Sequence, residues 1–124
     1  MLKNIILVGV GGLAGSITRY LVSVLFAGYS DKIPLSTWIV NIVGSFLIGI
    51  IYAISELTPN FVWMRLLLAT GFCGGFTTFS AFTSENLNLL QKGEYTLFFF
   101  YVSTSILIGI LAVLAGILVV KGLK

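Results

Sequence analysis

The sequence predicts an all-α integral membrane protein with four transmembrane helices, the third of which is broken. Hydrophobic residues make up 58% of the 124 residues and charged residues only 9%. Soluble domains carry about a quarter charged residues, so this chain could not cover a globular surface in water. The mean hydropathy is +1.11. Four long apolar segments each approach the roughly 20 residues that a helix needs to cross a bilayer.

The four expected spans form one membrane domain over residues 1–124, and they cover residues 4–27, 35–57, 61–90 and 95–120. Short polar segments separate them at residues 28–34, 58–60 and 91–94. Aromatic side chains near the expected span ends suit the aromatic belt of a membrane interface. These side chains are Trp38, Trp63 and Tyr95.

The composition also makes an enzyme improbable. The chain has no His, four acidic residues and a single Cys, so it offers few acid, base or metal-ligating groups. The seven Lys and Arg residues are scattered singly, which indicates juxtamembrane anchoring rather than nucleic-acid binding.

The basic residues give only a weak signal for orientation in the membrane. With four spans, one side would hold Lys3, Arg65, Lys121 and Lys124, and the other would hold Lys32 and Lys92. Such a chain can insert both ways, and two oppositely inserted copies could then pair as an antiparallel dimer.

Polar residues inside the first two spans are candidates for function or for helix association, because they are costly in hydrocarbon. Arg19 is expected either to snorkel as a structural residue or to provide a positive field that attracts an anion. Thr37, Asn41 and Ser45 recur every four residues and therefore share one helical face. This stripe could line an aqueous path or form hydrogen bonds between helices. Asn41 is the sharpest candidate, because its amide has two N–H donors that can replace water around an anion.

The third span contains the most unusual segment, residues 71–85, with three glycines, five hydroxyls and a carboxylate. We expect an unwound stretch near Gly74–Ser80, whose freed backbone groups could bind ions; the alternative is a glycine-rich packing contact. Phe79 and Phe82 flank Ser80, and the positive edges of their rings could stabilise a small anion. Tyr101 and Ser105 add two hydroxyls to one face of the fourth span.

Small residues in the first and fourth spans predict surfaces where helices approach closely. They are Gly11 and Gly15 in a GxxxG pattern, and Gly109, Ala112 and Gly116.

Nearly the whole chain resembles the small bacterial fluoride channels of the CrcB/Fluc family. The resemblance rests on the glycine and Arg motif at residues 11–20, on Asn-Ile-Val-Gly-Ser at residues 41–45 and, above all, on residues 71–85. It implies a dual-topology antiparallel homodimer with two fluoride pores, each lined by both subunits. Ala81 departs from the pattern, which commonly has a hydroxyl or another small residue there.

The resemblance also implies roles for individual residues. The fluoride pore would be lined by Asn41, Phe79, Ser80, Phe82, Thr83, Tyr101 and Ser105. Arg19 and Glu85 would be structural or electrostatic elements. The backbone carbonyls of Gly74 and Thr77 would hold a structural sodium ion that is not transported.

The expected function is passive, fluoride-selective export down the electrochemical gradient across the bacterial inner or plasma membrane, which would lower cytoplasmic fluoride. The partners would be fluoride, membrane lipid and a second copy of the chain. Two alternatives remain at this point. One is a small proton-coupled multidrug or cation exporter using Glu56 or Glu85, and the other is a non-transporting assembly subunit.

Overall fold

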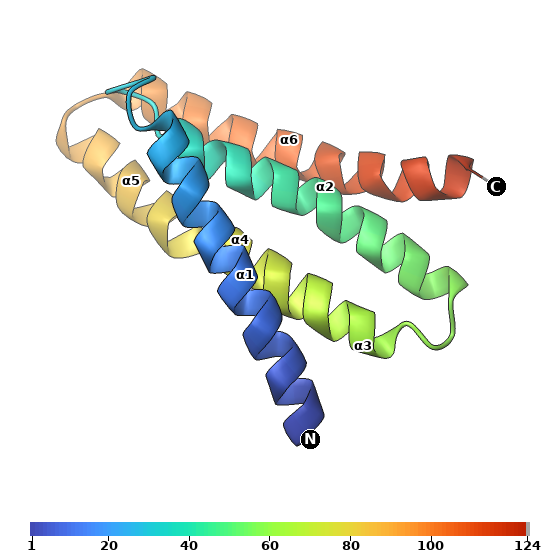
Figure 1. Cartoon of the computed structure of the whole chain (residues 1–124). Helices are drawn as coiled ribbons and strands as arrows, with labels where there is room; N and C mark the ends of the chain where they lie inside the picture. The colour runs from blue at the N-terminus through green and yellow to red at the C-terminus, as the bar shows by residue number, and fades with distance from the viewer. Residues whose placement is uncertain (124) are drawn as a thin grey trace.

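A computed structural model describes residues 1–123, and these residues form helices joined by short connections (Figure 1). In order, the elements are α1 (Leu2–Phe26), α2 (Leu35–Leu57), α3 (Val62–Arg65), the π-helix η1 (Leu66–Cys73), α4 (Gly74–Phe76), α5 (Phe79–Gln91) and α6 (Tyr95–Gly122). Four segments are long and apolar enough to cross a membrane: Leu2–Phe26, Leu35–Leu57, Val62–Gln91 and Tyr95–Gly122. The predicted all-α, four-span fold is confirmed for the described residues.

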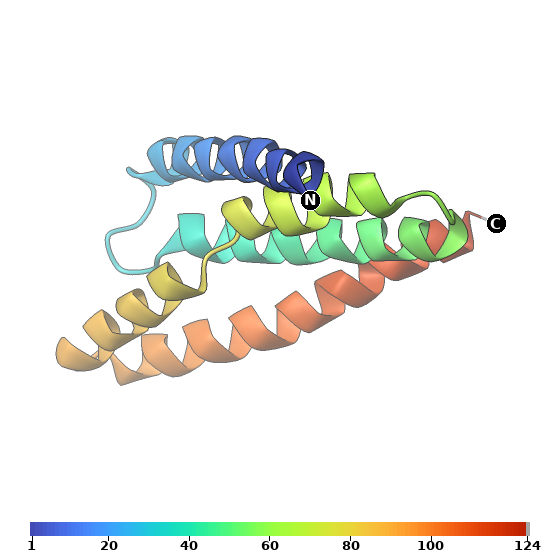
Figure 2. The same cartoon turned by 90° about the horizontal axis from the view of Figure 1, so that it is seen from below.

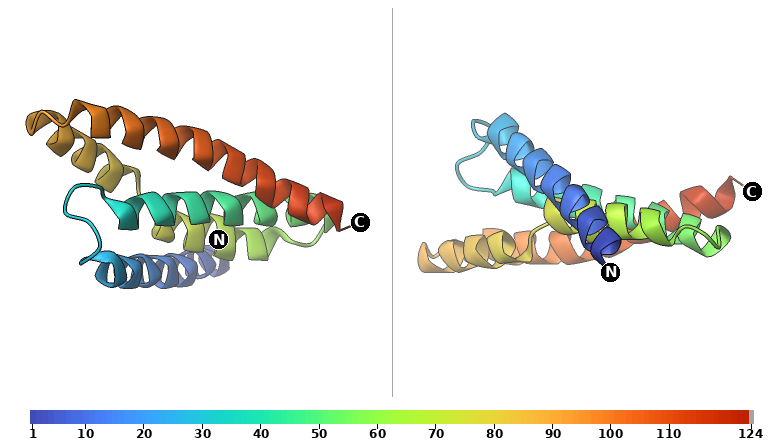
Figure 3. Two further views of the ribbon diagram at one scale, coloured as in Figure 1. Left: turned by 90° about the horizontal axis from the view of Figure 1, so that it is seen from above. Right: turned by 60° about the horizontal axis from the view of Figure 1, so that its bottom comes forward.

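The spans are arranged around α2. Figures 2 and 3 show α1 and α6 on opposite sides of α2, and η1 and α4 pack against α1. The α2 and α6 helices lie side by side and run in the same direction, while the third span runs in the opposite direction (Figure 1). The second half of that span, α5, turns away towards α6, so the two halves contact different neighbours.

Glycines set the closest approaches between spans, as the sequence predicted. A Cβ atom added to Gly11 would collide with the carbonyl oxygen of Leu67, and one added to Gly15 would collide with that of Phe72. On the other side, a Cβ at Gly116 would collide with the α2 backbone. Missing side chains at these positions let backbones pack against one another, which compensates for the weak hydrophobic driving force in lipid.

The break in the third span is confined to two residues. Thr77 (φ −84°, ψ 159°) and Thr78 (φ −150°, ψ 117°) are extended and separate α4 from α5. Thr78 is the N-cap of α5, because its hydroxyl accepts a hydrogen bond from the Ala81 backbone N–H at 3.2 Å. The break is narrower than the predicted stretch of residues 74–80, since this cap lets helix resume at once.

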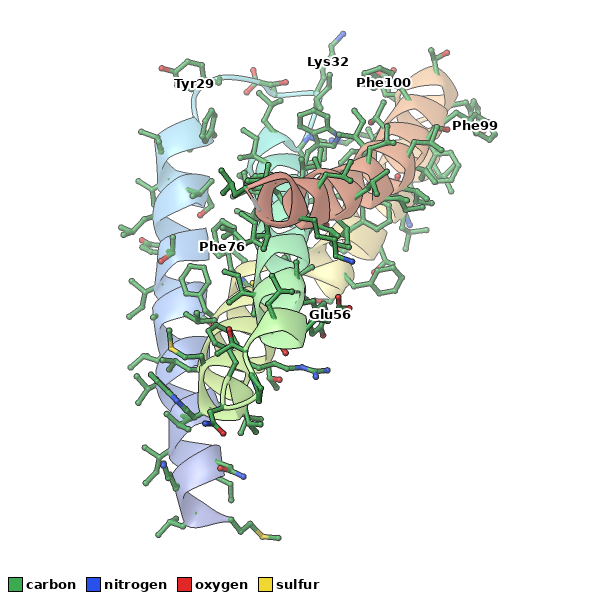
Figure 4. The ribbon with its side chains drawn as sticks, turned by 90° about the vertical axis from the view of Figure 1, so that its right-hand side faces the viewer. Tyr29, Lys32, Glu56, Phe76, Phe99 and Phe100 are labelled. Atoms are coloured by element: carbon green, nitrogen blue, oxygen red, sulfur yellow. The ribbon has the colours of Figure 1, made fainter. Side chains whose placement is uncertain are left out.

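Apolar side chains cover the outside of the bundle. Phe99 and Phe100 extend outward from α6 at the end of the molecule that carries Tyr29 and Lys32 (Figure 4). By contrast, the Phe76 side chain is buried at the end of α4. A surface of this kind is suited to lipid rather than to water.

Candidate functional site

The Asn41 side chain holds the break in place. Its Nδ2 donates to the Thr78 carbonyl oxygen at 3.1 Å, and its Oδ1 accepts from the Thr78 backbone N–H at 2.8 Å. One amide therefore satisfies both the N–H and the carbonyl of Thr78 at the break. The second proton of Nδ2 is donated to no residue among positions 1–123 and remains for a ligand or for water.

The Glu85 side chain connects three helices, α5, α2 and α6. Its Oε1 accepts from the Thr37 hydroxyl of α2 at 2.6 Å, and its Oε2 accepts from the Tyr101 hydroxyl of α6 at 2.8 Å. Thr37 and Tyr101 are both buried, with 6% and 1% of their surface exposed. These two hydrogen bonds therefore hold α5 against both α2 and α6.

Three aromatic rings lie next to one another beside the Glu85 hydrogen bonds. The ring centroids of Phe79 and Phe82 are 6.0 Å apart, and those of Phe82 and Tyr101 are 5.1 Å apart with a 56° angle between the planes. The Phe79 side chain is 76% exposed, whereas Phe82 is partly buried and Tyr101 is buried. The two predicted phenylalanines therefore come together, with Phe79 on the open surface.

Three hollows adjoin one another along these residues. The first, of about 380 Å³, is lined by Asn41, Gly74 and Thr77 among others, and it shares Thr78 with the second. The second, of about 420 Å³, shares Glu85 with a third of about 150 Å³ beneath the loop between α1 and α2. Three partly polar hollows therefore lie between the helix break and the loop that joins α1 to α2, each sharing one lining residue with the next.

The sequence leaves two roles open for the polar stripe of α2 (Thr37, Asn41 and Ser45): to line an aqueous path, or to form hydrogen bonds between helices. The structure contains features of both. Thr37 and Asn41 bond to the third span, which is the interhelical role, while Ser45 donates to the Asn41 carbonyl of its own helix at 2.7 Å. All three also line the hollows. The stripe therefore both joins the helices and faces the hollows.

Arg19 lines the second hollow together with Ser16, Ser23 and Glu85. It forms no salt bridge with any carboxylate in residues 1–123. Arg19 therefore borders a partly polar hollow without a carboxylate partner in the described residues, and its electrostatic role stays a prediction.

The other predicted lining residues are distributed around the break. Ser80 and Thr83 are exposed on α5, where Thr83 donates to the Ser80 carbonyl at 3.0 Å. The Ser105 hydroxyl on α6 is buried and has no hydrogen-bond partner in the described part of the chain. A buried hydroxyl without a partner is rare, and it leaves hydrogen-bonding capacity for a ligand or water.

The carbonyl oxygens of Gly74 and Thr77 have the chemistry required of hard-cation ligands. Within residues 1–123, neither oxygen accepts a hydrogen bond, because the break removes their usual donors. Gly74 is exposed and has open space where a Cβ would lie. Freed carbonyls of this kind fit a sodium ion, and no cluster of three or more His, Cys, Asp or Glu residues in the described chain offers a different metal site.

Sequence reasoning did not single out two residues that organise the site. Thr78 is the hydrogen-bond partner of Asn41 and the cap of α5, and its position beside Thr77 after a glycine-rich segment is a helix-start signal. Trp38 was interpreted as an interfacial residue, but its indole N–H donates to the Thr104 hydroxyl at 3.1 Å. No local sequence signal identifies that pairing, because the two residues lie 66 positions apart.

The fold and the site define a small multi-pass α-helical membrane protein with a discontinuous third helix, braced by an amide and lined by hydroxyls and aromatic rings. The family model for CrcB-like proteins, described as Camphor Resistance (CrcB), matches residues 6–117, and the chain belongs to this family.

Curated relatives match over almost their entire length. A protein of Bacteroides fragilis named fluoride-specific ion channel FluC is 47% identical over 119 residues, covering 93% of this chain and 94% of the relative. A protein of the same name from Leptospira interrogans is 46% identical over 124 residues, covering 96% and 95%. Another from Flavobacterium psychrophilum is 38% identical over 125 residues, covering 98% and 100%. An ion channel is not an enzyme, and these relatives do not favour an exporter or an assembly subunit.

Proposed function

We propose that this protein is a fluoride-specific ion channel that lets fluoride leave the cytoplasm passively and so lowers its concentration there. The observation that carries the proposal is the set of three hollows that share Thr78 and Glu85 as lining residues, in a chain whose relatives are named fluoride-specific channels. The membrane would be the bacterial inner or plasma membrane.

The lining groups suggest how fluoride is selected. Fluoride is small and strongly hydrated, so a path must replace its water with hydrogen-bond donors and positive ring edges. Asn41 and Phe79 both line the first hollow, where Asn41 offers its second Nδ2 proton, and the ring of Phe82 lies 6.0 Å from that of Phe79. Ser105, Ser80 and Thr83 supply further hydroxyls. Larger anions would be excluded by the width of this path.

The functional unit we propose is an antiparallel homodimer of two oppositely inserted copies. Polar groups near the middle of the third span, including Thr70, Gly74 and Ser80, are exposed in the single chain. Leaving such groups in lipid is costly, and a second copy would cover them and enclose the open side of Phe79. The bias of basic residues between the two ends, four against two, is weak, which favours dual insertion.

A structural sodium ion at the centre of this dimer is supported by the free carbonyls of Gly74 and Thr77. Both copies would contribute these oxygens. The ion would neutralise the carbonyl dipoles where the two breaks meet and hold the subunits together, without being transported.

Proteoliposomes test the proposed lining. Vesicles loaded with potassium fluoride and containing wild-type protein should release fluoride when valinomycin removes the opposing voltage, as followed with a fluoride electrode. Asn41→Ala and Phe79→Ala should slow this release. The matched control is Phe99→Ala, which removes an equally apolar, outward-facing ring from α6. Equal rates for Phe79→Ala, Asn41→Ala and the control would contradict the assigned lining.

A further inference from the structure

The side chain of Trp38 connects α2 to α6 beside the proposed path. Its Nε1 donates to the Thr104 hydroxyl at 3.1 Å, and that hydroxyl in turn donates to the Phe100 carbonyl at 2.7 Å. The hydroxyl proton is thus used within α6, which leaves an oxygen lone pair directed at the indole N–H. An interfacial anchor would instead keep its indole N–H for water or lipid headgroups.

Neighbouring residues of α2 hold both helices that carry lining groups. Thr37 bonds to Glu85 on α5, Trp38 bonds to Thr104 on α6, and Tyr101 on α6 bonds back to Glu85. These hydrogen bonds form a closed ring through α2, α5 and α6. Without the Trp38–Thr104 bond, the Tyr101–Glu85 bond would be the only one that connects α6 to the other two helices in this ring.

No other side-chain hydrogen bond in the described chain joins α2 directly to α6, since the Thr37–Glu85–Tyr101 link passes through α5. The other polar link between these helices is the Lys121–Glu56 ion pair at 3.5 Å, which is exposed and lies at the far end. The remaining contacts between α2 and α6 are apolar or are close glycine–backbone approaches such as those of Gly116 and Gly49. They bring the two backbones together but orient no polar side chain.

Thr104 lies three residues after Tyr101 and Ser105 lies four after it, so each is a helical neighbour of Tyr101 on α6. Adjacent helical residues differ in height by about 1.5 Å, and the Tyr101–Glu85 bond is 2.8 Å long. A slide of α6 by even part of that rise would lengthen this bond and move both hydroxyls along the path.

We propose, on the basis of the proposed channel function, that Trp38 is a positioning residue: its bond to Thr104 sets the height at which Tyr101 and Ser105 face the fluoride path. Trp38 itself does not touch the ion.

Four variants isolate this bond. Trp38→Phe removes the N–H and keeps an aromatic ring, Thr104→Val removes the acceptor with little change in volume, and Thr104→Ser restores the hydroxyl. Trp63→Phe is the matched control, because Trp63 is half exposed at another helix end. Fluoride release is measured per folded protein in proteoliposomes, and thermal unfolding is measured in parallel.

We expect Trp38→Phe and Thr104→Val each to slow fluoride release about fivefold, the equivalent of one hydrogen bond. The combined variant should be no slower than the slower single variant, because both remove the same bond. Thr104→Ser should stay within about twofold of wild type. In the Trp63→Phe background, Trp38 emission should shift to shorter wavelength with Thr104→Val but not with Thr104→Ser.

Wild-type flux in both single variants, or losses that multiply in the combined variant, would overturn the positioning role. A lower unfolding temperature with unchanged flux would also overturn it, since the bond would then be structural alone. A wild-type protein that releases no fluoride would overturn the proposed function instead, and the positioning role with it. Should Trp38→Phe not fold, the comparison of Thr104→Val with Thr104→Ser decides the question.

Discussion

Replacing Asn41 by Leu removes both hydrogen bonds that brace the break in the third span while keeping a similar side-chain volume. The Thr78 N–H and carbonyl then lose partners at 2.8 and 3.1 Å, and Thr78 is only 9% exposed. A buried polar group left unpaired costs about 1–3 kcal/mol. Thr78 borders two hollows, where water can reach its carbonyl, so the N–H is the group left unpaired and we expect the free energy of unfolding to fall by about 1–3 kcal/mol.

The assay is equilibrium unfolding of purified protein in detergent micelles by added sodium dodecyl sulfate, followed by circular dichroism. Ser45→Ala is the control, because the Ser45 hydroxyl donates only to the backbone of its own helix, and its effect should be within about 0.5 kcal/mol. An Asn41→Leu variant as stable as Ser45→Ala would refute the conclusion that the amide braces the break.

Three further results are expected. Gly11→Ala should lower the free energy of unfolding by about 1–3 kcal/mol, because its Cβ would collide with the backbone of the third span. The control is Gly9→Ala, whose Cβ meets nothing within 4 Å and should not destabilise the fold. The same micellar unfolding assay compares the two variants. Tyr101→Phe leaves one Glu85 oxygen without its donor, so it should lower the free energy of unfolding by about 1–3 kcal/mol and slow fluoride release. Wild-type values for both quantities would contradict the hydrogen bonds by which Glu85 connects three helices. Glu56→Gln breaks the ion pair with Lys121, in which the Glu56 and Lys121 side chains are 67% and 53% exposed. It should change the free energy of unfolding by less than about 1 kcal/mol at any salt concentration. A larger loss would contradict the conclusion that this exposed ion pair contributes little to stability.

The spans and the close glycine contacts were predictable because their signals are local. Charge-free runs of sufficient length determine where helices can cross lipid, and the GxxxG pattern of Gly11 and Gly15 indicates a surface for close approach. The mid-segment cluster of glycines and hydroxyls in the third span likewise predicted a break.

The partners at the site were not predictable, because they depend on how the helices are placed against one another. Asn41 and Thr78 are 37 positions apart, Thr37 and Glu85 are 48 apart, and helical periodicity does not specify the register between spans. The π-helix that precedes the break has no distinctive composition. For the same reason Trp38 was interpreted from its place near a span end, whereas its bonding partner lies on α6.

Comparing fluoride with chloride release from the same proteoliposomes tests the central claim most directly. Purified wild-type protein is reconstituted into vesicles loaded with equal fluoride and chloride, the voltage is removed with valinomycin, and both anions are followed with selective electrodes. The account predicts rapid release of fluoride while chloride stays inside. Release of both anions at similar rates, or of neither from folded protein, would contradict a fluoride-selective path at the broken helix.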